Sequence, residues 1–157
     1  QWQVCIGIEA AGICVGSLST GDEVVNLSVT LTVDAGCSIA AQSVYDFGQA
    51  SFIEDIGAIP VPFQVSCSRD LSFDYYFDGG SNYTGSWRRM MNGAEAIQYG
   101  IYLADGVTPV GPTLANAVAA TGTGMFENYN LSASVNPSQG PVPPGVYQDQ
   151  VLIVVEF

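Results

Sequence analysis

The chain has 157 residues, of which 48% are hydrophobic and 11% are charged. Three Lys and Arg residues stand against 15 Asp and Glu residues, there is no His, and the formal net charge is −12. Without His, the chain has no Ser-His-Asp or Cys-His catalytic machinery and no histidine metal ligand. The negative charge disfavours binding to a nucleic-acid backbone. The length and apolar content predict one folded domain with a hydrophobic core rather than a disordered chain.

The alternation of apolar and polar residues has a period of two almost throughout, which predicts strands rather than helices. The clearest strand covers residues 25–33, where Val25, Leu27, Val29, Leu31 and Val33 alternate with small polar residues. Further strands are predicted over residues 61–67, 71–77, 96–103, 125–135 and 145–157, and Pro62 moves the start of the first of these toward a sheet edge. Residues 115–120 are predicted to be a loop or a short strand.

Turn-forming clusters separate these strands, at residues 78–82, 92–93, 105–106 and 141–145. Seven or eight strands divided by turns at this spacing are typical of an all-β fold. We therefore expect an immunoglobulin-like antiparallel sandwich.

The four cysteines are Cys5, Cys14, Cys37 and Cys67, and no two of them have the C-x-x-C spacing of zinc and redox motifs. In a small acidic chain, an even number of cysteines indicates two structural disulfides formed in an oxidising compartment. Three pairings are possible, and we favour Cys5–Cys14 with Cys37–Cys67. We recognise no signal peptide and no apolar run long enough to span a membrane, so we expect a mature, exported, soluble product.

Potential chemical sites have simpler structural explanations. Residues four apart on a strand are separated by about 13 Å, too far for one metal ion or a catalytic pair, so Asp70, Asp74 and Asp78 are interpreted as a solvated strand face. Arg88 and Arg89 are interpreted as ion-pair partners of these aspartates across a hairpin. We expect no catalytic residue, no metal site and no cofactor, and we predict that the protein is not an enzyme.

Three stretches together resemble the spore coat U domain family, the pilins of archaic (Csu-type) chaperone–usher pili. The first is the alternating strand at 25–33 that runs into Cys37. The second is the Tyr-Asp-Phe-Gly string at 45–48, followed by Phe-Gln-Val-Ser-Cys at 63–67. The third is the proline-containing segment 142–150 leading into the apolar terminus 151–157. The resemblance covers residues 25–157.

This resemblance implies an incomplete immunoglobulin-like fold that a strand from a neighbouring subunit completes. Residues 25–33 would be the donor strand, with Val25, Leu27, Val29, Leu31 and Val33 as the donor side chains. Val151, Ile153, Val155 and Phe157 would lie on the acceptor-groove edge. The implied partners are neighbouring copies of the subunit in a fibre, and a periplasmic chaperone and an outer-membrane usher during assembly. The implied location is a cell-surface pilus reached through the periplasm.

Residues 1–24 depart from the family pattern, because a cysteine-bearing segment precedes the donor strand. This N-terminal extension has its own alternation at Trp2, Val4, Ile6 and Ile8, so it is interpreted either as a second hairpin or as a competing donor strand. Three other functions stay open at this stage: a tip or adhesin subunit of the same kind of pilus, a secreted carbohydrate-binding β-sandwich module, and a spore or cyst coat protein.

Overall fold

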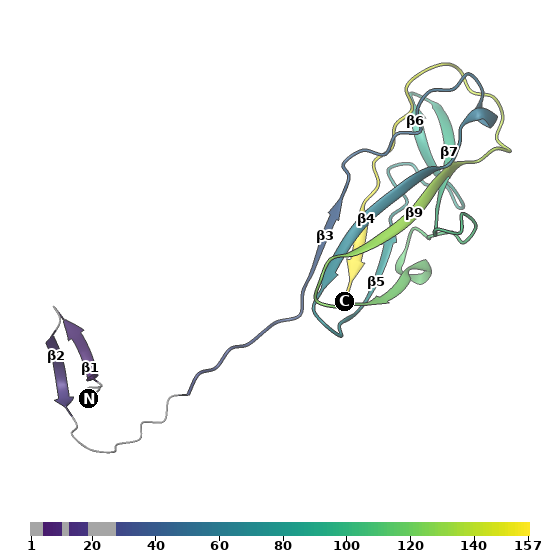
Figure 1. Cartoon of the computed structure of the whole chain (residues 1–157). Coiled ribbons are helices and arrows are strands. Elements are labelled where there is room, and N and C mark those ends of the chain that lie inside the picture. The colour runs from purple at the N-terminus through teal and green to yellow at the C-terminus, as the bar shows by residue number, and fades with distance from the viewer. Residues whose placement is uncertain (1–4, 11–12, 19–27) are drawn as a thin grey trace. The chain divides into compact units, whose positions relative to one another are not determined.

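A computed structural model describes the backbone of residues 5–10, 13–18 and 28–157, and side chains from residue 28 onward (Figure 1). Two compact units are distinguished, Gln1–Val33 and Asp34–Phe157. In the first, β1 (Cys5–Ala10) and β2 (Ile13–Leu18) pair as an antiparallel hairpin, with Cys5 opposite Leu18 and Cys14 opposite Glu9. These two cysteines are not cross-strand partners in this register. Their side chains lie outside the described residues, so the Cys5–Cys14 disulfide stays a prediction.

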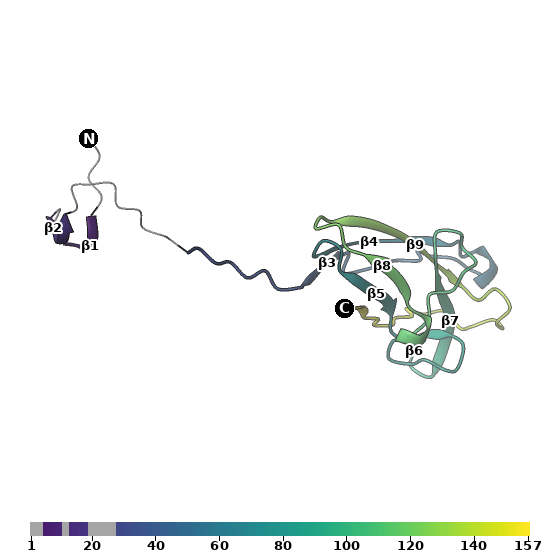
Figure 2. The ribbon, with the colours of Figure 1, turned by 90° about the horizontal axis from the view of Figure 1, so that it is seen from below.

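The second unit is a sandwich of two antiparallel sheets, as the sequence predicts. One sheet has five strands in the order β3-β4-β9-β7-β6, and the other has three in the order β10-β5-β8. Figures 1 and 2 show β4 and β9 in one layer and β5 in the other. The strands are β3 (Cys37–Ala41), β4 (Ile59–Cys67), β5 (Ser72–Phe77), β6 (Arg88–Asn92), β7 (Glu95–Tyr102), β8 (Val118–Thr121), β9 (Glu127–Val135) and β10 (Ile153–Glu156).

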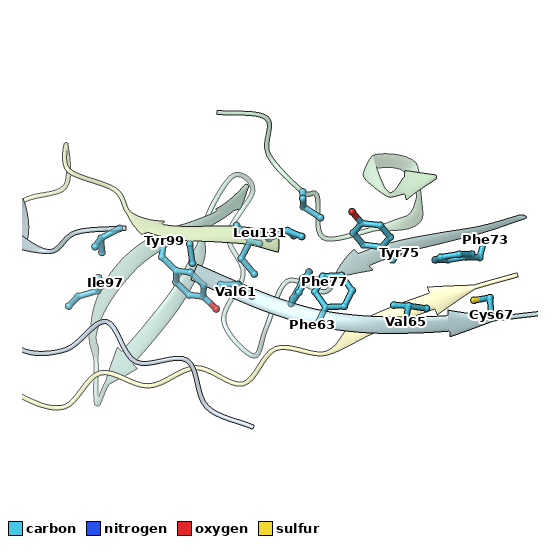
Figure 3. Packing of buried hydrophobic residues seen from close by; sticks show 14 of the residues in the cluster. Val61, Phe63, Val65, Cys67, Phe73, Tyr75, Phe77, Ile97, Tyr99 and Leu131 are labelled. Atoms are coloured by element: carbon cyan, nitrogen blue, oxygen red, sulfur yellow. The ribbon is translucent and has the colours of Figure 1, made fainter. Parts of the chain in front are cut away.

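The core lies between β4 and β9 on one side and β5 on the other. Figure 3 shows Phe63 and Val65 in a row along β4, and Tyr75 and Phe77 on β5. The ring of Phe63 contacts both β5 aromatics edge to face, at centroid distances of 5.3 and 5.6 Å, and stacks on Tyr129 of β9. Alternate residues on each strand are buried, because successive side chains of a strand point to opposite faces.

Most predicted strands are present, with ends shifted by one or two residues. Pro60 and Pro62 lie in the part of β4 that pairs with β9 alone, because the pairing of β3 with β4 ends at Phe63 of β4. Proline has no N–H to donate, so it fits this stretch with one strand partner. The two strands β3 and β6 were not predicted, and the segment 115–120 divides into a short 3₁₀ turn (Leu114–Asn116) and β8.

Two predicted strands differ from the structure. The predicted strand 145–157 is a strand only at Ile153–Glu156, because the chain changes sheets before it. Residues 28–33 form no strand with any described segment of the chain, and Val25 and Leu27 lie outside the described residues. A strand needs a hydrogen-bonded neighbour, so an alternating pattern alone does not make one.

Open sheet edges and an exposed apolar segment

The alternating segment that the sequence singles out leaves its apolar side chains in solvent. Val29, Leu31 and Val33 are 84%, 84% and 80% exposed. Large aliphatic side chains at every second position are typical of a strand with one buried face. The sequence thus carries the pattern of a strand with one buried face, and Val29, Leu31 and Val33 on that face are exposed.

β10 is one of the two edge strands of the three-stranded sheet. It pairs with β5 through Ile153↔Phe77 to Glu156↔Asp74 and has no second strand partner among residues 28–157. Of the predicted acceptor residues, Val151, Ile153 and Val155 are partly buried and pack against the core. Phe157 is 63% exposed, so it contributes little to that core. An unpaired edge presents free N–H and C=O groups to any extended chain.

β3 is an edge strand of the five-stranded sheet and lies on the same side of the sandwich as β10 (Figure 1). Its partner on the inner side is β4. Although Ile39 lies mid-strand, it is 41% exposed. The side of the sandwich bordered by β3 and β10 is therefore open both in backbone pairing and in side-chain packing.

A disulfide lies at the start of β3, where the chain enters the sandwich. Cys37 and Cys67 are cross-strand partners and form the predicted disulfide. Just beyond it, Gly36 N–H donates to the Ser68 hydroxyl at 3.1 Å, and Ser68 N–H donates to the Gly36 carbonyl at 2.9 Å. Ser68 thus binds Gly36 through both of the backbone polar groups of Gly36.

A polar cluster lies where the chain approaches β10. This polar cluster consists of Asp78, Asp149 and Tyr99. The Tyr99 hydroxyl donates to Asp149 Oδ2 at 2.8 Å, and Leu152 N–H donates to Asp78 Oδ1 at 2.9 Å. Burial, together with the hydrogen bond to the Asp149 carboxylate, raises the pKa of Tyr99 well above its usual range, with the Arg88 guanidinium opposing in part.

Arg88 lies beside this cluster and is 4% exposed. Its guanidinium donates to the carbonyl oxygens of Asp78, Phe77 and Val110, at 2.7, 2.5 and 3.2 Å. Burial lowers the pKa of Arg88, and the nearby tyrosines and carboxylates partly offset this. The predicted ion pairs are therefore wrong in this detail: Arg88 binds backbone carbonyls, and Arg89 donates to the Asn82 carbonyl at 2.7 Å.

The interpretation of Asp78 as part of a strand face is also wrong, because Asp78 lies just beyond the end of β5. Its carboxylate accepts hydrogen bonds from the backbone N–H of Gly80 and of Leu152. Asp70 lies in a turn with a φ of 62°, and only Asp74 occupies a strand. The sequence signal for Asp78 was the Asp-Gly-Gly turn itself, since aspartate in turns commonly accepts backbone hydrogen bonds. Asp149 gave no such signal.

The sequence and fold have identifiable relatives. A family model described as the Spore Coat Protein U domain matches residues 23–154. No curated protein matches the chain. No helix among the described residues is long and apolar enough to cross a membrane.

Several solved structures are similar to this chain. One is the CsuC–CsuE chaperone–tip adhesion subunit pre-assembly complex from archaic chaperone–usher Csu pili of Acinetobacter baumannii, with 24% identity and a TM-score of 0.61 over 80% of this chain and 40% of that chain. This chain thus spans well under half of that relative. The P pilus rod subunit PapA matches with 17% identity and a TM-score of 0.60 over 76% of this chain and 97% of that chain.

The third is a chaperone–usher pilus in a structure that concerns rod uncoiling, with 20% identity and a TM-score of 0.59 over 91% of this chain and 99% of that chain. At these identities the three likenesses establish a shared pilin-type, immunoglobulin-like fold. The family model is independent of them and covers most of the sequence. The chain belongs to the Spore Coat Protein U domain family.

Proposed function

We propose that this protein is a structural subunit of an extracellular chaperone–usher pilus and that it polymerises by donor-strand exchange. The observation that carries the proposal is the exposure of Val29, Leu31 and Val33 in a chain whose sandwich is open along β10. Each copy has an apolar segment that pairs with no described strand, and it also has a sheet edge at β10 with no strand partner among residues 28–157. Exchange between copies satisfies both.

The energetics favour this assignment. Burying each aliphatic side chain contributes roughly 1.5–3 kcal/mol, so five of them (Val25, Leu27, Val29, Leu31 and Val33) contribute on the order of 10 kcal/mol. Pairing with β10 also satisfies backbone groups at an edge that would otherwise promote aggregation. In this proposal Val151, Ile153, Val155 and Phe157 lie on the acceptor edge. A head-to-tail contact of this kind does not close on itself, so it propagates as a fibre.

The family and the fold support the same function. The three similar structures are a chaperone–subunit complex, a pilus rod subunit and a pilus. By analogy, a periplasmic chaperone would occupy the open edge before assembly and an outer-membrane usher would deliver the subunit to the fibre. The proposed location is therefore the cell surface, and the proposed role is structural rather than enzymatic.

In the proposed organisation, residues 1–24 are an extension ahead of a pilin domain at 25–157, with residues 25–33 as the donor strand. The β1–β2 hairpin lies within this extension. That arrangement corresponds to the hairpin interpretation of residues 1–24 and leaves the donor role to residues 25–33.

A pair of single substitutions tests the donor assignment. Leu31→Asp places a charge on the apolar face of the segment, whereas Thr30→Asp places the same charge one residue away on the opposite face. Leu31→Asp should abolish polymerisation in size-exclusion chromatography and electron microscopy, and Thr30→Asp should polymerise normally. Normal fibres from Leu31→Asp would contradict the proposal, as would equal loss in both variants.

A further inference from the structure

The chain changes sheets immediately before β10. Gln148 exchanges two backbone hydrogen bonds with Met91 on β6, at 2.8 and 3.1 Å, in the five-stranded sheet. Four residues later Leu152 is bound to Asp78 after the end of β5: Asp78 N–H donates to the Leu152 carbonyl at 2.9 Å, and Leu152 N–H donates to the Asp78 carboxylate at 2.9 Å. Residues 149–151 thus carry the chain from one sheet to the other.

One carboxylate fixes this crossing. Asp149 Oδ2 accepts from the Tyr99 hydroxyl on β7 at 2.8 Å, while Oδ1 accepts from the N–H of Ser81 at 3.1 Å and of Gln150 at 2.9 Å. Asp149 therefore binds both a strand of the five-stranded sheet and the turn that follows β5. Hydrogen bonds to an ionised carboxylate are stronger than those between neutral groups.

The C-terminal segment beyond this crossing lies at a sheet edge, and none of residues 151–157 is fully buried. β10 has four residues and pairs only with β5. Leu152 is 60% exposed, and Ile153, Val154 and Val155 are only partly buried. Short edge segments with few buried contacts open locally at low free-energy cost. The position of β10 therefore depends on its pairing with β5, on the Leu152–Asp78 hydrogen bonds and on the anchor at its N-terminal side.

We propose that Asp149, held by Tyr99, is a positioning residue that keeps β10 in place to receive a donor strand. This inference rests on the proposed function. A donor strand pairs only with molecules whose edge is in place, so the apparent dissociation constant is the intrinsic one divided by the fraction of such molecules. A variant with about one tenth of its molecules anchored binds about tenfold more weakly.

The probe is a fluorescent peptide of residues 25–33, and the parent protein is the full chain carrying Val29→Asp and Leu31→Asp so that its own segment does not compete. Tyr99→Phe and Asp149→Asn are introduced into this parent, and peptide affinity is measured by fluorescence anisotropy. Tyr99→Phe keeps the ring, which packs against Phe47, and removes only the hydroxyl. Tyr45→Phe is the matched control, because it removes a hydroxyl hydrogen bond to Pro62 on β4.

Both Tyr99→Phe and Asp149→Asn should weaken peptide binding about tenfold, and Tyr45→Phe should change it less than twofold. Amide hydrogen exchange of residues 151–155 should accelerate in the first two variants, while exchange of β4 and β9 stays at the parent rate. This local pattern separates positioning from general destabilisation, and Tyr99→Phe keeps the test valid if Asp149→Asn fails to fold.

Failure of the positioning role and failure of the proposed function give different results. If the parent binds the peptide and both variants bind it equally well, the positioning role is overturned and the proposed function stands. Faster exchange spread evenly over β4, β9 and β10 also overturns the positioning role. If the parent itself does not bind the peptide, the proposed donor–acceptor function falls, and the positioning role falls with it.

Discussion

Cys37 and Cys67 form the terminal residue pair of the β3–β4 ladder, and a disulfide joins them across the two strands. Ser68 holds Gly36 immediately beyond this pair. The disulfide and the hydrogen bonds of Ser68 together hold the start of β3 against the end of β4.

Replacing both Cys37 and Cys67 with Ser should lower the free energy of unfolding by about 3–4 kcal/mol, because the disulfide closes a loop of 30 residues. Urea denaturation followed by circular dichroism measures this difference. The reduced wild-type protein should match the double variant. A change below about 1 kcal/mol would mean that the disulfide adds little to the stability of the sandwich.

Arg88→Lys should lower the free energy of unfolding by about 2–4 kcal/mol. A lysine ammonium cannot reproduce the planar fork that reaches three carbonyls, and the unpaired carbonyls would remain buried. Arg69 is exposed, so Arg69→Lys is the control and should be nearly neutral. Equal effects of the two substitutions in thermal unfolding would contradict the role assigned to the buried guanidinium.

Gly80→Ala should be more destabilising than Gly85→Ala. Both glycines have positive φ, +70° and +59°, so each alanine incurs a backbone cost of about 1 kcal/mol. Only at Gly80 would the new Cβ also collide with the Asp149 carboxylate, whereas the space around Gly85 is open. Chemical denaturation of the two variants isolates the steric part. Equal destabilisation would show that Asp149 does not lie close against this turn.

Alkaline pH should unfold the protein through its buried tyrosines. Burial raises the pKa of Tyr75 to about 12, and the pKa of Tyr99 is raised further for the reasons given above. Below pH 10 these phenols are neutral in both states and the stability is complete. As the pH rises from about 10 toward 12, the unfolded chain loses these protons while the folded chain retains them, so the free energy of unfolding falls.

Tyrosinate absorbance and circular dichroism, recorded together against pH, test this. Part of the tyrosinate signal should appear only as the β-sheet signal is lost. If all eight tyrosines ionised near pH 10 with the β-sheet signal intact, burial of Tyr75 and Tyr99 would be contradicted.

The inner faces of the sandwich could be predicted because they depend on local alternation. Phe73, Tyr75 and Phe77 follow a period of two, and all three are buried as expected. β6 could not be predicted, because Arg88 is its buried residue and its pattern is not apolar. The extent of β10 depended on where the chain changes sheets, which is a property of tertiary contacts rather than of the apolar run.

The candidate site likewise contains one feature that local sequence predicts and one that depends on tertiary contacts. The alternation of Val29, Leu31 and Val33 is visible in the sequence, whereas the solvent exposure of these side chains is visible only in the structure. The anchor formed by Tyr99 and Asp149 joins residues 50 positions apart, and no local pattern marks such a pair. Sequence spacing identifies strands. The position of the β10 edge, in contrast, depends on hydrogen bonds between residues that are far apart in the sequence.

In the proposed fibre, residues 25–33 of one copy complete the sandwich of the next. Electron cryomicroscopy of fibres formed by the full chain tests it most directly. We expect density for residues 25–33 as a strand beside β10 of the neighbouring copy, with Val29 and Leu31 facing the core of that copy. Fibres in which residues 25–33 stay outside the neighbouring sandwich, or lie beside β10 of their own copy, would contradict it.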